Sequence, residues 1–197
     1  GSSWTNVTPT NMPPEGRIQS IDASPHAAGT AYVAGYRYLL NDFEPYIYKT
    51  DDFGATWTRL TDGANGIAID TPVRVVREDP HRQGMLFAGT EYGFYVSMND
   101  GGEWHRFDSG LPASPITDIR IYKGDIALST MGRGFWVLDD ITSLRTFTSA
   151  DEAQFVQPRA TFRSRRFVRG GGPAAPQYAS AGVKLDYFLP AEMKGDA

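Results

Sequence analysis

Acidic side chains are the residues of this 197-residue chain that could do acid–base chemistry. Two carboxylates that face each other across a cleft can act as acid and as base or nucleophile in the cleavage of a glycosidic bond. Several positions qualify by residue type, but no spacing between them selects a pair. The candidates are Asp22, Asp42, Glu44, Glu78, Asp79, Glu91, Asp118, Asp139 and Asp140. No catalytic residue is therefore assigned from the sequence.

A further carboxylate, Asp52, belongs to a motif that backbone capping explains better than catalysis. Residues 50–57 read TDDFGATW, and residues 97–104 repeat the pattern as SMNDGGEW. In each copy, hydroxyl and Asp or Asn oxygens can accept hydrogen bonds from nearby backbone N–H groups, while glycine allows a positive φ. The final tryptophan offers a large apolar surface to the next strand. The motif positions are Thr50, Asp52, Gly54 and Trp57 in the first copy, and Ser97, Asn99, Gly101 and Trp104 in the second.

The three histidines do not suggest a metal site. His26 and His81 occupy equivalent positions in two copies of the pattern Pro-His-x-x-Gly, so each is expected on its own repeat, and His105 is expected to be exposed. Structural loop histidines fit this placement better than ligands do, and we find no calcium-loop spacing of carboxylates. We predict no metal and no cofactor.

The best candidate for a binding site is the aromatic stretch GYRYLLNDFEPY, expected as a long insertion between two strands. Functional residues favour loops on a rigid scaffold. Tyr36, Tyr38 and Phe43 are candidates to stack on a sugar or to contact a protein; the alternative is that they pack the insertion against its own sheet. Tyr92 and Arg133 lie in the corresponding shorter loops, so one face is expected to gather Tyr38, Tyr92 and Arg133.

Composition excludes several classes of function. The chain has 19 basic and 23 acidic residues and a formal charge of −4, which argues against a nucleic-acid partner. It has no cysteine, so disulfides and cysteine-ligated metals are excluded. No apolar run approaches the roughly 18 residues of a transmembrane helix. Aromatic residues at 13% with 21 glycines are typical of many short strands joined by tight turns.

Strand patterns recur with the turn motif, about 40 to 55 residues apart, which is roughly the length of a four-stranded propeller blade. The expected strands are 17–22, 30–37, 45–49 and 57–60 in the first unit, 73–77, 85–88, 93–98 and 104–107 in the second, and 116–121, 126–130 and 134–138 in the third. In the third unit the motif has decayed to 139–142, as expected where an array ends or closes. At the start of the chain, Gly1, Ser3 and Trp4 match the end of a further copy.

These patterns divide the chain into segments. Residues 1–148 are expected to form three units, over 1–60, 61–108 and 109–148. Residues 149–169 follow as a closing strand and a basic segment, either a site for an acidic partner or solvated surface. Residues 170–182 form a Gly/Pro linker, and residues 183–197 begin a further β domain or form a packed tail. The arginines of the basic segment are Arg159, Arg163, Arg165, Arg166 and Arg169.

The motif resembles that of the Asp-box, or bacterial-neuraminidase-repeat, proteins. Residues 46–50, 74–80 and 132–140 resemble the last blades of large bacterial exported proteins with sortilin-like propellers, often described as glycosyl hydrolases by homology. The resemblance covers roughly residues 1–145. It implies an all-β fold, a partial β-propeller of about three four-stranded blades followed by the first strand of a β-sandwich. Three blades cannot close a ring, so the chain is expected to be part of a larger propeller or assembly, and poorly soluble or oligomeric alone.

Three functions are compatible with this resemblance. We favour a non-catalytic binding or scaffold module of an exported bacterial protein, periplasmic or extracellular, that recognises a protein or a glycan. The first alternative is a fragment of a sialidase- or xyloglucanase-like glycoside hydrolase whose cleft lies mostly outside this segment. No motif here assembles the arginine triad and Tyr–Glu pair of sialidases. The second alternative is a periplasmic subunit docked to a membrane complex.

Overall fold

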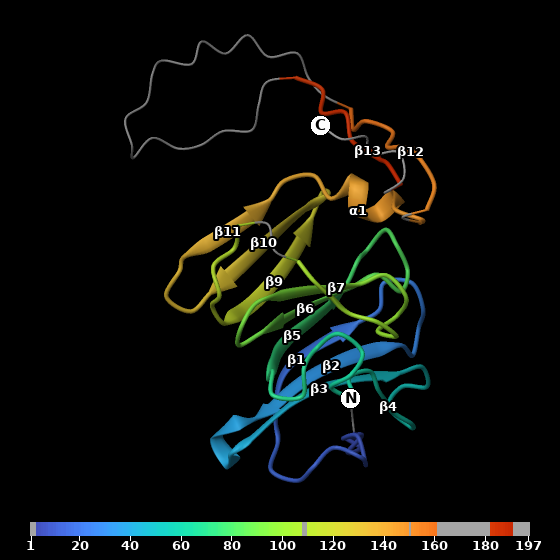
Figure 1. Cartoon of the computed structure of the whole chain (residues 1–197). Helices are drawn as coiled ribbons and strands as arrows, with labels where there is room; N and C mark the ends of the chain where they lie inside the picture. The colour runs from blue at the N-terminus through green and yellow to red at the C-terminus, as the bar shows by residue number, and fades with distance from the viewer. Residues whose placement is uncertain (1–2, 108–109, 150, 161–181, 191–197) are drawn as a thin grey trace. The chain divides into compact units, whose positions relative to one another are not determined.

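The computed structural model describes residues 3–107, 110–149, 151–160 and 182–190. The chain divides into two compact units, Gly1–Leu138 (unit 1) and Asp139–Ala197 (unit 2). Unit 1 contains three antiparallel sheets that follow one another along the chain (Figure 1). Among the described residues, no helix is both long and apolar enough to cross a membrane.

The first sheet, here called blade 1, has its four strands in sequence order. These are β1 (Arg17–Ala23), β2 (Ala31–Arg37), β3 (Asp42–Thr50) and β4 (Thr58–Arg59). The central strand β2 is almost continuously buried, and β3 is mostly buried from Pro45 onward, as expected for short apolar runs covered on both faces. The first strand, β1, is the inner strand of the blade and is largely exposed, with Ser20 as its only buried residue.

Blade 2 repeats this arrangement. Its strands are β5 (Val73–Glu78), β6 (Leu86–Thr90), β7 (Phe94–Ser97) and β8 (His105–Arg106). Every residue of β6 and β7 is buried, because this blade lies between the other two. The two sheets thus have the short fourth strand that follows each turn motif.

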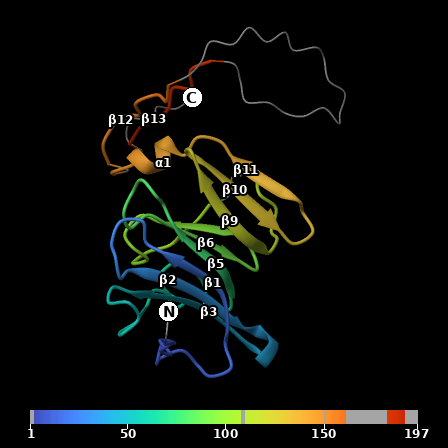
Figure 2. The same cartoon turned by 180° about the vertical axis from the view of Figure 1, so that it is seen from behind.

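Blade 3 has three strands, β9 (Ile116–Tyr122), β10 (Asp125–Thr130) and β11 (Phe135–Leu138), with β10 in the middle. The inner strands β1, β5 and β9 contact one another in that order, so the three sheets stack like neighbouring blades (Figure 2). Within the described residues, blade 3 lacks the fourth strand of blades 1 and 2.

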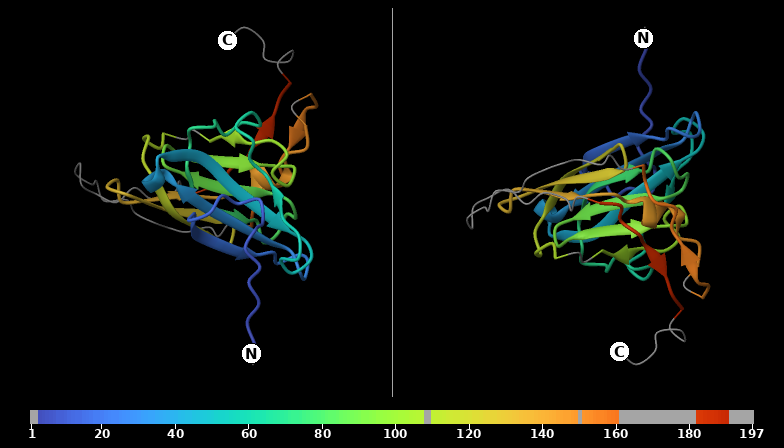
Figure 3. Two further views of the ribbon diagram at one scale, coloured as in Figure 1. Left: turned by 90° about the horizontal axis from the view of Figure 1, so that it is seen from below. Right: turned by 90° about the horizontal axis from the view of Figure 1, so that it is seen from above.

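A hydrophobic cluster of unit 1 lies between the sheets of blades 1 and 2, which overlie each other in the views of Figure 3. Its side chains come from β2 and β3 of blade 1, from β5, β6 and β7 of blade 2, from the connection between the blades and from the second turn motif. The cluster comprises Tyr32, Ala34, Ile47, Ile67, Val73, Val76, Leu86, Ala88, Tyr95 and Trp104. Burial of this apolar surface holds neighbouring blades together.

Unit 2 contains α1 (Thr142–Thr146) and a two-stranded antiparallel sheet of β12 (Gln154–Phe155) and β13 (Tyr187–Phe188). The rings of Phe147 and Phe188 meet edge to face at 5.0 Å. The sequence did not predict α1, because a helix of five residues is too short to show helical periodicity. Arg163, Arg165, Arg166, Arg169 and most of the predicted 170–182 linker lie outside the described residues, as does Gly1.

The predicted all-β fold with four-stranded, propeller-like sheets is confirmed. Predicted and observed strands differ by a few residues at their ends at most. One local prediction was wrong, since the aromatic stretch is not a long insertion. Strand β2 continues to Arg37 and β3 begins at Asp42, so only a short 3₁₀ turn, η1 (Tyr38–Leu40), and Asn41 separate them.

Candidate binding surface

The first turn motif is closed by its own side chains. Thr50 Oγ1 accepts a hydrogen bond from the Gly54 N–H at 2.9 Å and donates one to Asp52 Oδ1 at 2.8 Å. Asp52 Oδ1 also accepts from the Thr56 N–H, and Asp52 Oδ2 accepts from the Thr56 hydroxyl. These hydrogen bonds hold the pKa of Asp52 below its usual range, and those from Thr56 have the largest effect. The carboxylate therefore acts as a backbone cap.

The second motif has the same network with an amide in place of the carboxylate. Ser97 Oγ accepts from the Gly101 N–H at 2.9 Å and donates to Asn99 Oδ1 at 3.0 Å. Asn99 Oδ1 accepts from the Glu103 N–H at 2.9 Å. Because a neutral Asn replaces Asp52 without changing the geometry, the charge of Asp52 is not needed to form the turn.

The tryptophan of each motif reaches across to a preceding segment. Trp104 Nε1 donates to the carbonyl oxygen of Leu60 in blade 1 at 3.2 Å, and its side chain is only 2% exposed. Trp57 Nε1 donates to the carbonyl oxygen of Val7 at 2.7 Å and is partly exposed. Both motifs therefore have a structural role in joining neighbouring segments of the fold.

The carboxylates of unit 1 that we considered as catalytic candidates have structural partners. Asp42, Glu44, Glu91 and Asp118 pair with Arg37, Arg59, Arg74 and Arg77, respectively. Asp79 Oδ1 accepts from the backbone N–H groups of His81 and Arg82. Tyr46 also donates to Asp42, and burial together with this bond raises the pKa of Tyr46 to about 12. Charge pairing and, for Asp79, backbone capping explain these residues without catalysis.

Asp22 and Glu78 are two catalytic candidates that line one cavity, of about 220 Å³, near the ends of β1 and β5. Asp22 Oδ2 accepts from the Glu78 N–H at 2.9 Å, and burial raises the pKa of Asp22. Glu78 Oε1 accepts from the Gly84 N–H, whereas Glu78 Oε2 is buried with no hydrogen-bond partner among the described residues. Arg77 lines the same cavity and lies 3.8 Å from Asp22.

The histidines have the structural roles expected of loop residues. His26 Nε2 lies 2.8 Å from the carbonyl oxygen of Asp79 and links blade 1 to blade 2. His81 is fixed through its backbone N–H by Asp79, and His105 is exposed beside Glu103. In the part of the chain that the structure describes, no cluster of His, Asp and Glu side chains could hold a metal ion.

The predicted binding residues of the aromatic stretch separate into buried and exposed groups. Tyr36 is only 4% exposed, and its ring stacks on Tyr38 with centroids 4.5 Å apart. Tyr38 is partly exposed, whereas Phe43 is exposed together with Leu39 and Leu40 of η1. Tyr36 is therefore part of the support, and the exposed tip consists of Leu39, Leu40 and Phe43.

Arg74 of β5 fixes this hairpin to blade 2. Its guanidinium Nε lies 2.6 Å from Glu91 Oε1, and its Nη2 donates to the Tyr38 hydroxyl at 3.2 Å. The same guanidinium lies 5.5 Å and 5.7 Å from the ring centroids of Tyr36 and Tyr38, within cation–π range. The buried Arg74 thus joins two loops of the predicted face and links the hairpin to blade 2.

Tyr92 and Arg133 lie in corresponding loops, as the repeat predicts. The Glu91 N–H donates to the carbonyl of Pro72, and the Met131 N–H makes the same bond to Pro115 in the next blade. Tyr92 is exposed and directly follows Glu91, the ion-pair partner of Arg74. Arg133 is exposed in blade 3, in the loop between β10 and β11.

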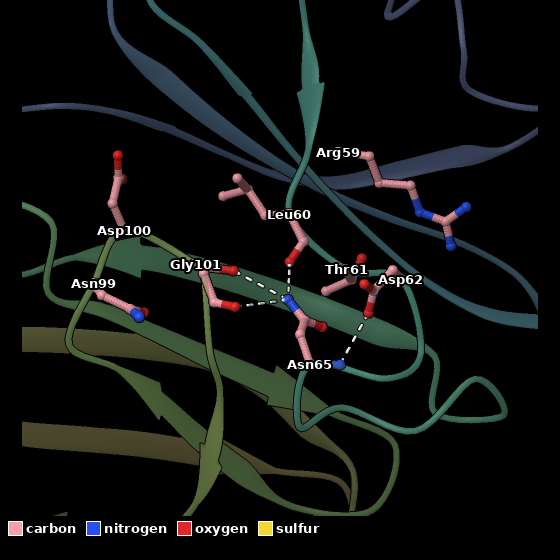
Figure 4. Close-up of a pocket in the computed structure, with 9 residues that line it drawn as sticks. Arg59, Leu60, Thr61, Asp62, Asn65, Asn99, Asp100 and Gly101 are labelled. Atoms are coloured by element: carbon pink, nitrogen blue, oxygen red, sulfur yellow. Dashed lines mark hydrogen bonds between the residues drawn. The ribbon is translucent and has the colours of Figure 1, made fainter.

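A second cavity, of about 310 Å³, lies between the end of β4 and the second turn motif (Figure 4). Asn65 Nδ2 donates to the carbonyl oxygens of Leu60 and Gly101, at 2.8 and 3.1 Å, and so links the two blades. The Asn65 N–H is held in turn by Asp62 Oδ1 at 2.9 Å. Asp100 points away from Asn65 in this view and binds Tyr32 and Lys49. The residues that line this cavity therefore include those that join the two blades.

The sequence alone did not identify Arg74, Asn65 or the exposed leucines Leu39 and Leu40. Arg74 stands in an apolar run, VRVVRE, where a charged residue next to buried valines was the signal that could have found it. Asn65 lies in a stretch rich in Gly, Asp and Asn that also fits an ordinary loop. Its role depends on a neighbouring blade.

No family model and no curated protein matches the sequence. Solved structures do resemble the chain. A GH74 enzyme of Niastella koreensis aligns with a TM-score of 0.50 and 18% identity, over 73% of this chain and 24% of that one. An ancestral GH74 enzyme gives 0.47 and 22%, over 59% and 14%. YCF48 bound to D1 peptide gives 0.43 and 12%, over 63% and 37%.

The chain therefore spans much less than half the length of these structures. The likeness to the Niastella koreensis enzyme shows the fold: the three sheets of unit 1 are propeller-like blades. At this identity the likeness does not carry an activity or a ligand over to the chain.

Proposed function

We propose that this chain is a non-catalytic β-propeller module that binds another macromolecule through the tip of the β2–β3 hairpin and the neighbouring Tyr92. One observation carries the proposal: Leu39, Leu40, Phe43 and Tyr92 are all exposed, and Leu39 is 73% exposed. Contiguous apolar side chains exposed to water are typical of interaction sites. Tyr38, which precedes the tip, and Glu91, which precedes Tyr92, both contact Arg74.

The support beneath this surface makes it suitable for recognition. Arg74 holds Tyr38 and Glu91, and Tyr36 stacks below Tyr38. Asn41 adopts the left-handed conformation at φ 61°, which closes the tip tightly. A tip that is already ordered loses little conformational entropy when it binds.

A protein is the ligand class that the side chains favour over a glycan. Sugar rings stack on aromatic faces, which Phe43 and Tyr92 offer, but Leu39 and Leu40 have no such face. Adjacent leucines at an exposed tip fit an apolar pocket of a protein partner. We therefore propose protein recognition first and glycan recognition as the alternative.

The experiment compares Leu39 with Tyr122, an exposed aromatic residue at the end of β9 in blade 3. A photoreactive amino acid is placed at position 39 or at position 122, and crosslinked species from the source cells are compared. We expect a discrete protein adduct at position 39 alone, which Leu40→Ser abolishes. Wild-type protein and Tyr92→Ala are also applied to a glycan array. Identical adducts at both positions, or glycan binding that only Tyr92→Ala abolishes, would overturn the protein proposal.

We also assign the two turns to the Asp-box class, in view of their shared hydrogen-bond network, and place the protein in the bacterial periplasm or outside the cell. The support for this location is the family resemblance of the motif-bearing segments. Fractionation of the source cells with an antibody against unit 1 tests it, and recovery in the cytosol alone would contradict it.

A glycoside hydrolase fragment is the second candidate, favoured by one observation. Asp22 and Glu78 line the same cavity, and burial raises the pKa of Asp22, as a general acid at neutral pH requires. Asp22→Asn and Glu78→Gln should then each abolish hydrolysis of xyloglucan or sialosides. Binding without hydrolysis by the wild-type chain favours the non-catalytic module.

A further inference from the structure

The third strands of the three blades carry equivalent residues with very different exposure. Ile47, Phe94 and Phe135 occupy the same ladder position, opposite Ala34, Gly89 and Ser129 of their middle strands. Ile47 and Phe94 are 0% and 3% exposed, because each is followed by another blade, but Phe135 is 84% exposed. The outer face of blade 3 therefore has the pattern of a blade–blade interface.

The inner strands show the same contrast at the opposite end of the stack. Ile21, Val76 and Ile119 are equivalent, opposite Val33, Ala88 and Leu128. Val76 and Ile119 are fully buried against the preceding blade, whereas Ile21 is 70% exposed. The outer face of blade 1 is thus the counterpart of the outer face of blade 3, since one normally packs on the other.

The N-terminal segment occupies the place of a preceding fourth strand. The carbonyl oxygen of Val7 accepts a hydrogen bond from the indole N–H of Trp57. In the same way, the carbonyl oxygen of Leu60 accepts one from the indole N–H of Trp104. A Cβ on Gly54 would meet Val7 at 2.8 Å, and a Cβ on Gly101 would meet Leu60 at 2.8 Å. Residues 4–7 therefore lie on blade 1 as residues 57–60 lie on blade 2.

Within the part of the chain that the structure describes, blade 3 lacks the strand that this segment resembles. In blades 1 and 2 a short fourth strand pairs with the third, β4 with β3 and β8 with β7. Among the described residues, β11 pairs only with β10, so its other edge has free backbone donors and acceptors. One end of unit 1 thus offers a fourth strand, and the described residues at the other end do not include one.

We propose that unit 1 associates head to tail with a second copy of this chain. The Phe135 face of one copy packs on the Ile21 face of the next, and residues 4–7 of that next copy lie along the free edge of β11. The interface repeats the two blade–blade contacts already present within the chain. Such a heterologous contact closes a ring if the rotation permits and otherwise extends; two copies supply six blades. The contact is separate from the proposed binding surface, because it uses neither η1 nor Tyr92.

Light scattering after size exclusion tests this proposal on the full chain, from low micromolar concentration upward. We expect a mass that is a multiple of 21.7 kDa. Phe135→Asp and Ile21→Asp should each give a monomer, with the β-sheet spectrum by circular dichroism unchanged. Phe53→Asp is the matched control, because Phe53 is 77% exposed on a turn and the proposal gives it no role. This variant should remain oligomeric.

Mixing the two monomeric variants tests the head-to-tail geometry. An Ile21→Asp chain still has an intact Phe135 face, and a Phe135→Asp chain still has an intact Ile21 face, so the mixture should form a dimer. A peptide of residues 3–10 should compete for the β11 edge and lower the mass of the wild type, and the same peptide with Val7→Asp should not. A wild-type monomer at every concentration, or a mixture that stays monomeric, would overturn the proposal.

Discussion

The indole N–H of Trp104 donates a hydrogen bond across a blade boundary to the carbonyl oxygen of Leu60, at 3.2 Å. This bond satisfies the one polar atom of a large side chain that is otherwise packed in apolar surroundings. It ties the end of the second turn motif to the fourth strand of the preceding blade. The turn motif therefore determines how blades pack as well as how strands are joined.

Replacing Trp104 should destabilise unit 1 more than replacing Trp57. Trp104→Ala removes a fully buried aromatic side chain, and we expect it to lower the free energy of unfolding by about 3–5 kcal/mol. Trp57→Ala should cost less, because Trp57 is partly exposed. Urea unfolding followed by circular dichroism measures both. Equal losses in the two variants would show that burial does not set the difference.

The hydroxyl at the first motif position should be required, whereas its methyl group should not. Thr50→Ala leaves the buried Gly54 N–H without its acceptor, which should cost about 1–3 kcal/mol of unfolding free energy. Thr50→Ser keeps the acceptor, and serine already occupies the same position in the second motif, as Ser97. We expect the serine variant to unfold near the wild-type urea midpoint. A loss as large as that of the alanine variant would contradict the capping role.

The acid dependence of stability should decrease when Asp52 is replaced by asparagine. Hydrogen bonds from Thr56 and then Thr50 lower the pKa of Asp52 in the folded state. The unfolded chain therefore binds the proton more readily, so this contribution is fully present above the unfolded pKa of about 3.9 and is lost as pH falls through the folded pKa.

Urea midpoints measured below about pH 5 should fall less steeply for Asp52→Asn than for the wild type. Some dependence should remain, because hydrogen bonds from Tyr46, the Glu44 N–H and Arg37 lower the pKa of Asp42 against the opposing effect of burial, and those from Ala64 and Asn65 lower that of Asp62. Asn99 already provides the neutral form of the motif. Parallel acid curves for the two proteins would show that Asp52 is not shifted.

The strands and the turn motifs could be predicted from the sequence because their causes are local. Alternation of apolar residues, a glycine at positive φ and side-chain caps all act within a few residues of one another. The network around Thr50 and Asp52 follows from those residue types alone. The short helix α1 lies below the length at which a pattern can be recognised.

The candidate binding surface was predicted only in part, because residues far apart along the chain form it. Tyr36 was expected to be exposed as a binding residue, but its ring is buried near the end of β2. Arg74, which pairs with Glu91, contacts Tyr38 from another blade, and no local pattern indicates which repeats face each other. Leu39 and Leu40 were missed because exposed leucines have no motif.

The last prediction concerns Arg74, which is 8% exposed and holds the base of the proposed surface. Arg74→Met removes the charge but keeps much of the side-chain volume, and it leaves the Glu91 carboxylate uncompensated. We expect a loss of about 3–5 kcal/mol in unfolding free energy, most of it from the unpaired charge.

A double-mutant cycle separates the penalty of the unpaired charge from the free energy of the Arg74–Glu91 interaction. Arg74→Met combined with Glu91→Gln should recover part of the loss, because no charge remains unpaired, and the coupling free energy should reach about 0.5–3 kcal/mol. Tyr38→Phe is the milder test, since it removes only the 3.2 Å hydrogen bond and should cost about 1 kcal/mol. Strictly additive losses from Arg74→Met and Glu91→Gln would show that the two residues do not act together. The hairpin tip would then be held to blade 2 by packing of the tyrosine rings.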